Sequence, residues 1–317
     1  MAAGSSRTWV TRSTRAPRPD GHCRRRTTVE VATATGSLPA LAGKHDVLVL
    51  DKLCHACLID GARLSGATIR VFPHNDVPKL DRLLAGIRAR QPQARVIVVT
   101  ESVFSMDGDL CPLAGIVEAT DRHGALLFLD EAHAFGVLGP AGMGLAAELG
   151  LQRRVDFQMG TFSKAFASLG GVVVGDADVI DYVRHHARAL IFSASMPPAN
   201  IAAAAKALEI IEAEPERIQR LQAIAQKMLR GFKGLGFDIG TAETPIVPLH
   251  IKDNQKTFLF WKALYEAGIY VNPVIAPAVP PNGALIRTSY MAIHTDEELD
   301  TILEVSGQVG KRLGIIP

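Results

Sequence analysis

Short, uniformly apolar runs alternate along the chain with longer segments in which apolar residues recur every three or four positions. Runs of this kind, such as Val47–Leu50, Val96–Thr100 and Ala125–Asp130, predict buried strands, and the periodic segments predict helices. Further strands are expected at Thr68–Phe72, Val155–Gly160 and Gly171–Val174, and helices at Cys54–Ser65, Leu80–Arg90, Pro112–Arg122 and Ala177–Arg188. Strand–helix alternation of this length predicts an α/β fold with a mostly parallel sheet flanked by helices.

The C-terminal part of the chain has a different pattern. A long helical stretch is expected from Pro197 to Leu235, with one apolar face formed by Ile201, Ala204, Ala205, Leu208 and Ile211. It is followed by three strands at Pro245–Ile251, Ile269–Asn272 and Ala284–Tyr290, and by helices at Gln255–Ala267 and from Thr295 onward. We therefore expect a large domain over residues 44–214 and a small α+β domain over residues 215–317.

Residues 1–43 differ from the rest in composition. The first 26 residues hold seven arginines, one acidic residue and many Ser and Thr, without apolar periodicity. Such a segment buries too little surface to offset its ordering entropy, so we expect residues 1–43 to be disordered. An Arg-rich, acid-poor leader also fits an organellar transit peptide, although it has no apolar core of the secretory type.

The amino-acid composition argues against several classes of protein. A length of 317 residues suggests two domains, and 48% hydrophobic with 21% charged residues is ordinary for a globular protein. A net charge of +2 argues against nucleic acid or an anionic membrane as the main partner. No apolar stretch approaches the roughly 20 residues that a membrane span needs. Four cysteines do not form a disulfide scaffold, so a cytoplasmic location is expected.

Two motifs point to chemistry that their surroundings do not support. Asp130–His133 spells the acidic box of some helicases, but no phosphate-binding loop precedes it, since Gly43-Lys44 is followed by His45. Cys54–Cys57 is a C-x-x-C without the second pair that a structural zinc site needs. A redox dithiol stays open, but two small buried residues on a helix are favoured, and no metal is predicted.

Three other segments carry candidate chemistry. Asp130 follows a buried strand, where open α/β sheets bind ligands, although it could equally cap the next helix. Lys164 lies among small and hydroxyl residues; Thr161 and Ser163 before it could bind a phosphate, and the glycine pair Gly170-Gly171 follows. A lysine in an apolar site can form a Schiff base, whereas most lysines are simply exposed. Arg287 on a half-buried strand suits a carboxylate ligand or a structural ion pair.

Together the three segments predict pyridoxal 5'-phosphate (PLP) chemistry, with the acid facing the pyridine nitrogen, the lysine holding the aldehyde and the arginine holding an amino-acid carboxylate. The chain from about Gly36 onward resembles the α-oxoamine synthase family of fold-type I PLP enzymes. The motifs that carry the resemblance are Asp51–Gly61, Glu101–Asp109, Asp130–Gly136, Thr161–Gly171, Phe192–Pro198 and Arg287–Thr295. The resemblance covers roughly 280 residues.

The resemblance implies how the ring of the cofactor is held. His55 matches the histidine that stacks on the ring, and Ser105 a serine near the ring substituents. Asp130 matches the partner of the pyridinium nitrogen, and His133 the histidine that contacts the phenolic oxygen. Lys164 matches the lysine that forms the imine with PLP.

The resemblance also implies phosphate and substrate contacts. Thr161, with Ser163 beside it, matches a phosphate ligand. Ser193 and Ser195 lie in a stretch that reaches the cofactor phosphate or the acyl substrate across a homodimer interface. Arg287 matches the arginine that binds the carboxylate of the amino acid.

The reaction implied is a decarboxylative condensation of a small amino acid with an acyl-CoA or an acyl carrier protein, as in sphingolipid or biotin biosynthesis. The motifs favour the serine palmitoyltransferase branch; an 8-amino-7-oxononanoate synthase-like or glycine C-acetyltransferase-like activity is the alternative. The family's segment before the strand at Val47, with a phosphate-binding helix start, is not recognisable. We therefore also consider a truncated member that is weakly active or inactive.

Overall fold

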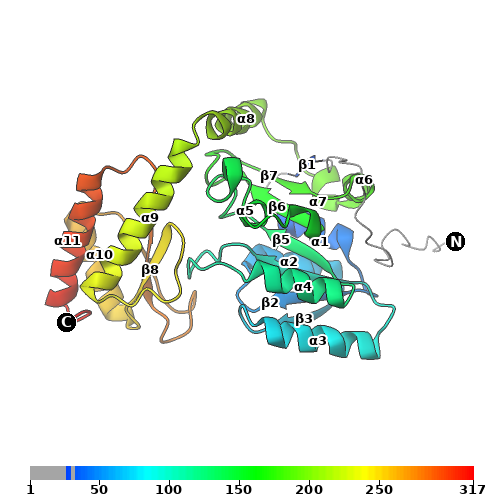
Figure 1. Cartoon of the computed structure of the whole chain (residues 1–317), viewed down its shortest axis with the longest axis horizontal. Coiled ribbons are helices and arrows are strands. Elements are labelled where there is room, and N and C mark those ends of the chain that lie inside the picture. Colours follow the sequence, from blue (N-terminus) through cyan, green and yellow to red (C-terminus); the bar gives the residue numbers. More distant parts are fainter. Residues whose placement is uncertain (1–25, 30–32) are drawn as a thin grey trace. The chain divides into compact units, whose positions relative to one another are not determined.

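The computed structural model describes residues 26–29 and 33–317. These residues belong to two compact units (Figure 1). The first unit extends to Ser102 and continues from Cys111 to Glu209, and the second comprises Val103–Leu110 and Ile210–Pro317. The sequence placed the boundary at residues 214/215 and did not assign the short segment 103–110 to the second unit.

A seven-stranded sheet forms the centre of the first unit, with strand order β1-β7-β6-β5-β4-β2-β3. The strands are β1 (Arg26–Val29), β2 (Val47–Asp51), β3 (Thr68–Phe72), β4 (Val96–Glu101), β5 (Leu126–Asp130), β6 (Phe157–Thr161) and β7 (Gly171–Val174). Strands β2 to β6 pair in parallel, whereas β7 and β1 pair antiparallel at one edge. The predicted α/β class with a mostly parallel sheet is confirmed.

Helices and short helical turns connect these strands or follow β7 along the chain. They are α1 (Thr33–Leu41), α2 (Ala56–Ser65), α3 (Val77–Arg90), α4 (Leu113–Arg122), η1 (Pro140–Gly142), α5 (Leu145–Glu148), η2 (Gln152–Arg154), α6 (Ala177–His186), α7 (Arg188–Ile191) and α8 (Pro198–Ala213). Helix α1 packs beside α2, and α3 beside α4 (Figure 1).

The strands of this sheet are buried because both faces are covered. One face carries Leu48, Leu50, Ile97, Val99, Leu126 and Phe128, which share a core with side chains of α1, α2 and α6. The alternate residues, such as Val49 and Val98, point to the opposite face and are equally buried. Uniformly apolar runs are the expected signature of strands covered on both sides.

The expectation of disorder over residues 1–43 is wrong for its last part. Residues 33–41 form α1, and Leu38 and Leu41 are fully buried in the core of the first unit. Residues 26–29 form β1 at the sheet edge. The remainder of the segment, residues 1–25 and 30–32, lies outside the described residues.

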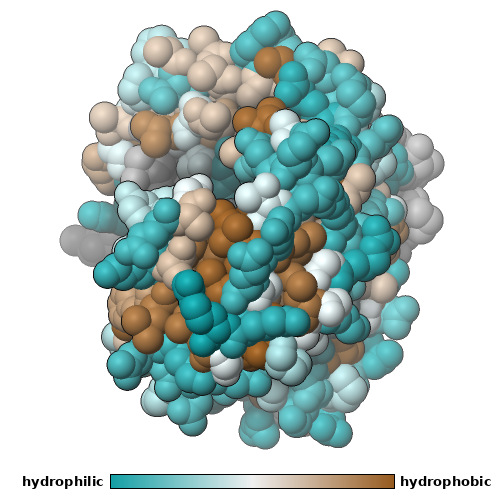
Figure 2. Space-filling model, turned by 90° about the vertical axis from the view of Figure 1, so that its left-hand side faces the viewer, coloured by the Kyte–Doolittle hydropathy of each residue, from teal (hydrophilic) through white to brown (hydrophobic). Residues whose placement is uncertain are grey.

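The second unit has a three-stranded antiparallel sheet, in the order β8-β10-β9, covered by helices. Its elements are α9 (Glu216–Leu235), β8 (Ile246–His250), α10 (Asn254–Glu266), β9 (Asn272–Val274), β10 (Leu285–Ser289) and α11 (Asp296–Arg312). Phe232, Phe237 and Phe260 lie at the centre of its core. Figure 2 faces this unit and shows hydrophobic residues (brown) between hydrophilic ones (teal) at its surface.

The predicted helical stretch Pro197–Leu235 is two helices. Helix α8 ends at Ala213, and α9 begins at Glu216 with Pro215 as its N-cap. A proline disfavours helical geometry in the preceding residue, which explains the break. Of the expected apolar face of α8, Ala204 is buried, whereas Ile201 is 53% exposed.

None of the helices among residues 26–29 and 33–317 is long and apolar enough to cross a bilayer.

Candidate active site

Three neighbouring parallel strands each end in a buried acidic residue. These are Asp51 on β2, Glu101 on β4 and Asp130 on β5, each at most 4% exposed. Strand β4 lies between the other two, and Glu101 and Asp130 are register partners. The carboxyl ends of parallel strands are where open α/β sheets bind ligands, so this edge is the natural position for a site.

The buried carboxylate of Asp130 has few interactions that would stabilise a negative charge. Its Oδ1 accepts a hydrogen bond from the N–H of Ala132 at 2.8 Å. Burial raises the pKa of Asp130 to about 7, against the lowering effects of that hydrogen bond and of the positive charge of Lys164. The alternative role as a cap of the next helix is wrong, because residues 131–134 form a turn and the next helical turn begins at Pro140.

Lys164 lies in the turn that connects β6 to β7. Thr161 is the last residue of β6, and its Oγ1 is 3.4 Å from Nζ of Lys164. The turn is closed by hydrogen bonds from the N–H of Phe162 to the carbonyl of Gly170 (2.9 Å) and from the N–H of Ser168 to the carbonyl of Phe162 (2.8 Å). Lys164 itself is exposed, so its amine is open to a reactant.

Aromatic rings support this turn from inside. Phe166 is buried and stacks on Phe135, with ring centroids 4.6 Å apart, and Phe162 lies 5.5 Å from Phe166. A Cβ atom on Gly160 would lie 2.8 Å from the Phe135 ring, so the glycine before Thr161 is needed for this packing. The rings tie the segment after Asp130 to the segment that carries Lys164.

His55 is the N-cap of α2 and lies within electrostatic reach of Lys164. Its Nδ1 accepts a hydrogen bond from the N–H of Cys57 at 3.2 Å and lies 3.0 Å from Sγ of Cys57. Burial and the Lys164 charge lower the pKa of His55. At neutral pH the ring is therefore uncharged, with its proton on Nε2 because Nδ1 is the acceptor.

The main-chain N–H of His55 donates to Oε1 of Glu101, which connects the start of α2 to the row of acids. Burial raises the pKa of the Cys57 thiol to about 12, and the neighbouring carboxyl groups add to this effect. Cys57 is therefore a neutral thiol. Within the described residues, no group of three or more His, Cys, Asp or Glu could hold a metal ion.

The remaining predicted residues of the first unit lie outside its helices and strands. His133 is half-buried in the turn after Asp130, and Ser163 is exposed beside Lys164. Ser193 and Ser195 are exposed in the segment between α7 and α8. The next residue, Met196, is buried against Gly170, where a Cβ would lie 2.4 Å from its Sδ.

Ser105 and Arg287 both belong to the second unit, where they meet. Arg287 lies on β10, the central strand, and its Nε donates to the carbonyl oxygen of Ser105 at 2.6 Å. Partial burial lowers the pKa of the Arg287 guanidinium. The alternative role in a structural ion pair has no support in the described part of the chain, where the ion pairs do not include Arg287.

Segment 103–110 is fixed within the second unit by backbone contacts. The carbonyl of Gly108 accepts hydrogen bonds from the N–H of Glu243 (3.0 Å) and from Oγ1 of Thr244 (2.9 Å). Gly108 has a φ of +66°, and a Cβ there would lie 2.0 Å from the carbonyl oxygen of Ile246. Glycine is therefore required where this segment approaches β8.

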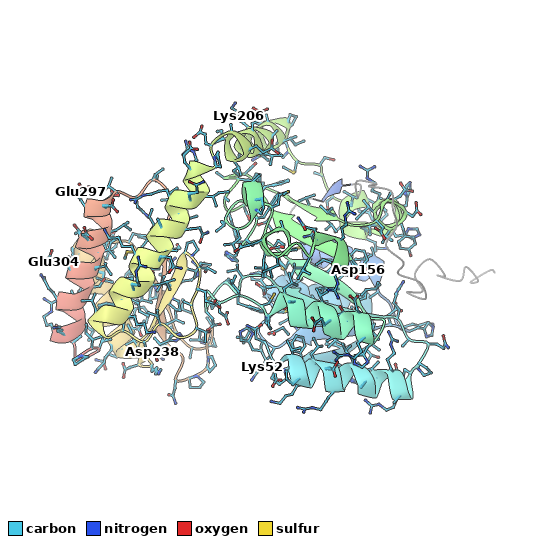
Figure 3. The ribbon with its side chains drawn as sticks, viewed as in Figure 1. Lys52, Asp156, Lys206, Asp238, Glu297 and Glu304 are labelled. Atoms are coloured by element: carbon cyan, nitrogen blue, oxygen red, sulfur yellow. The ribbon has the colours of Figure 1, made fainter. Side chains whose placement is uncertain are left out.

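The alignment of β6 with β5 depends on one acidic residue. Asp156, labelled in Figure 3, accepts a hydrogen bond on Oδ2 from the N–H of Leu127 at 2.8 Å, and its own N–H donates to the carbonyl of Leu127 at 3.1 Å. This pair precedes the ladder in which Asp130 is the register partner of Met159. It sets the positions of Asp130 and of the turn with Lys164 along the sheet.

Sequence reasoning did not assign Glu101 to the site. The signal was present, because an acidic residue follows the apolar run Val96–Thr100 just as Asp130 follows Ala125–Leu129. Asp51 follows Val47–Leu50 in the same way, but its carboxylate accepts hydrogen bonds from the N–H of Leu53 and Asn75 and contacts His74. Asp51 thus holds the turn that leads to His55.

Comparisons with known proteins agree with this arrangement. The family described as "Aminotransferase class I and II" matches residues 31–305. The chain belongs to this family. It is 44% identical over 280 residues to the serine palmitoyltransferase of Sphingobacterium spiritivorum, covering 88% of the chain and 69% of that protein. It is 42% identical over 279 residues to the 8-amino-7-oxononanoate synthase of Thermosipho melanesiensis, covering 88% of the chain and 71% of that protein.

A solved structure agrees over most of the chain. A variant of the serine palmitoyltransferase from S. paucimobilis, with a bound PLP–myriocin aldimine, superposes with a TM-score of 0.87 at 34% sequence identity. The match covers 92% of the chain and 74% of that structure. Both relatives are α-oxoamine synthases, so the predicted family is confirmed.

Proposed function

We propose that the chain is a PLP-dependent acyltransferase that condenses serine with an acyl thioester. The observation that carries the proposal is the cluster formed by Lys164, the buried Asp130 and the neutral His55 at the carboxyl edge of the sheet. The likeness to serine palmitoyltransferases, 44% in sequence and 0.87 in TM-score, supports the substrate pair.

The residues of this cluster fit PLP. Asp130 is a fully buried carboxylate that takes part in none of the ion pairs of the described chain, and its raised pKa reflects the missing counter-charge. A protonated pyridine nitrogen would supply that charge. The exposed amine of Lys164 can form an imine with the aldehyde, and the neutral ring of His55 can lie flat against the heterocycle.

A PLP group held by these residues would supply an electron sink for negative charge at Cα of the amino acid. Asp130 would keep the ring nitrogen protonated, and Nζ of Lys164 would remove and return the Cα proton as a general base. Thr161 and Ser163 hold the phosphate, with His133 and Ser105 near the ring substituents. The reaction joins Cα to the acyl carbonyl carbon and releases CO₂ and the thiol.

Arg287 is the proposed anchor of the amino-acid carboxylate. Its Nε is already engaged by the carbonyl of Ser105, which fixes the plane of the guanidinium and leaves its other nitrogens for a bidentate contact. Ser193 and Ser195 are proposed to contact the cofactor phosphate or the acyl substrate of a partner subunit. Their exposure, and that of Phe192 at 75%, suits an interface between two copies.

We further propose a homodimer and a cytoplasmic location. The exposed Ile201 of α8 adds to the apolar surface of the first unit that a second copy could cover. Cys54 and Cys57 form a C-x-x-C pair yet are both free thiols, which is typical of a reducing compartment. Light scattering at micromolar concentration tests the dimer, and a monomeric mass would contradict it.

An 8-amino-7-oxononanoate synthase activity is the second candidate, because a relative of that type is 42% identical. The two activities would differ in the amino acid and in the acyl thioester that are condensed. Incubation with serine, alanine or glycine, each against short and long acyl-CoAs, followed by mass spectrometry of the products, separates them. A product only from alanine or glycine would contradict the serine assignment.

A further inference from the structure

Of the three buried acids at the strand ends, Asp51, Glu101 and Asp130, only Glu101 has not been given a role above. Its neighbours belong to the same candidate site. It lies at the end of β4, directly beside Asp130 in the parallel ladder, with 4% of its surface exposed. Its Oε1 accepts a hydrogen bond from the main-chain N–H of His55. Glu101 therefore lies next to Asp130 and His55, the two residues proposed to contact the ring of PLP.

The charges around Glu101 are unfavourable to an anion. Asp130 and Asp51 lie on the two flanking strands and raise the pKa of Glu101, whereas the positive charge of Lys164 lowers it. Burial and the charge of Asp130 raise the pKa of Glu101 well above its usual range. Two neighbouring buried carboxyls cannot both ionise cheaply, so the neutral form of one of the two is favoured.

The hydrogen bond to His55 does not need a charge on Glu101. A protonated carboxyl retains a carbonyl oxygen that accepts from an N–H group. In this form Oε1 fixes the main chain at the N-cap of α2, where the side chain of His55 is in turn held by the N–H of Cys57. The buried Oε1 of Glu101 on β4 then sets the position from which the imidazole of His55 would stack on the ring of PLP.

We propose that Glu101 is a positioning residue of the PLP site: as a neutral acid it fixes the main chain of His55 and leaves Asp130 as the single negative charge for the ring nitrogen. This inference rests on the proposed function and extends it to a residue that touches neither substrate nor reacting atom. It also explains why an acid can lie beside Asp130 without competing for the pyridinium proton.

The test compares three substitutions of Glu101 in the full chain, with PLP as the probe. Glu101→Gln keeps the acceptor and the size but cannot ionise, Glu101→Met keeps the size but cannot accept, and Glu101→Ala removes both. Glu118→Gln on the exposed side of α4 is the matched control. Circular dichroism checks folding, and the visible absorbance of bound PLP gives its dissociation constant at pH 7.5.

Glu101→Gln is expected to bind PLP within about threefold of the wild type, whereas Glu101→Met and Glu101→Ala lose about tenfold or more, the usual effect of leaving a buried N–H group unpaired. A loss in Glu101→Gln as large as in Glu101→Met would mean that the charge is required. Equal binding by Glu101→Met and Glu101→Gln would mean that the side chain only fills space. Either result overturns the inference.

The melting temperature of the PLP-free chain, measured as a function of pH, reports on the ionisation of Glu101. Because the pKa of Glu101 is raised, ionisation of this residue lowers the stability of the wild type as pH rises above the ordinary glutamate range, and Glu101→Gln lacks this contribution while it keeps that of Asp130. The melting temperature of Glu101→Gln relative to wild type should therefore rise by about 2 °C or more between pH 5 and pH 8. A difference that stays constant or falls overturns the inference. If the wild type shows no Lys164-dependent PLP absorbance, the proposed function fails as well.

Discussion

Replacing Asp130 by asparagine should stabilise the PLP-free chain while it removes the catalytic function. Burial raises the pKa of this carboxyl from 3.8 to about 7. Each unit corresponds to about 1.36 kcal/mol, so ionising Asp130 in the folded chain costs about 4 kcal/mol. Asparagine has nearly the same shape, and its Oδ1 can still accept the N–H of Ala132.

The sign of the pH dependence follows from linkage. Below about pH 4 the carboxyl is protonated in the folded and unfolded chains, and its ionisation does not favour unfolding. Between pH 4 and pH 7 the unfolded chain loses this proton while the folded chain keeps it, so the wild type loses stability with rising pH. Above pH 7 the full loss of about 4 kcal/mol remains, which Asp130→Asn avoids.

The assay is thermal unfolding of both proteins, without and with PLP, at pH 5 and pH 8. At roughly 2 °C per kcal/mol for a long chain, PLP-free Asp130→Asn should melt about 8 °C above the wild type at pH 8 and much closer to it at pH 5. Asp178→Asn, an exposed acid on α6, is the control. Adding PLP should stabilise the wild type more than the variant. A difference that does not grow with pH would refute the reasoning.

Three further predictions test the site. Lys164→Ala should abolish the visible absorbance of bound PLP, and its persistence would place the imine elsewhere. Arg287→Ala should raise KM for the amino acid about tenfold or more with a smaller effect on KM for the acyl-CoA, because a charged bidentate contact is lost; an unchanged KM would mean that another group holds the carboxylate. Gly108→Ala should lower the melting temperature and raise KM for the amino acid, because its Cβ would displace the carbonyl of Ile246. Gly66→Ala, with a φ of +70° but no neighbouring atoms, is its control and should cost about 1 kcal/mol from backbone strain alone; equal losses in both would contradict the steric explanation.

The fold could be predicted from the sequence where burial on both faces leaves a uniform apolar run. Strands β2, β4 and β5 fall within one residue of their expected bounds for this reason. Helix α1 was missed because its two fully buried leucines, Leu38 and Leu41, lie among small and polar residues that give little amphipathic contrast. The antiparallel pairing of β7 could not be predicted either, because direction depends on the connection and not on strand composition.

The sequence predicted which residues form the candidate site, but it did not predict the hydrogen-bond partners that hold them. Lys164, Asp130 and His55 are brought together as expected. The hydrogen bond from His55 to Glu101 could not be predicted, because the two residues are 46 positions apart and meet only through the pairing of β4 with β5 and β2. The carbonyl of Ser105 as partner of Arg287 is a main-chain group, and side-chain patterns carry no signal for it.

The discontinuous course of the second unit has a practical consequence for fragment expression. A C-terminal piece that begins at Ile210 lacks residues 103–110, which are contributed from the middle of the polypeptide. In such a piece the hydroxyl of Thr244 and Nε of Arg287 would both lose the carbonyl groups that they bind. No single proteolytic cut can release this unit intact. Arg287, the proposed ligand of the amino-acid carboxylate, keeps its contact with Ser105 only in a polypeptide that contains both segments.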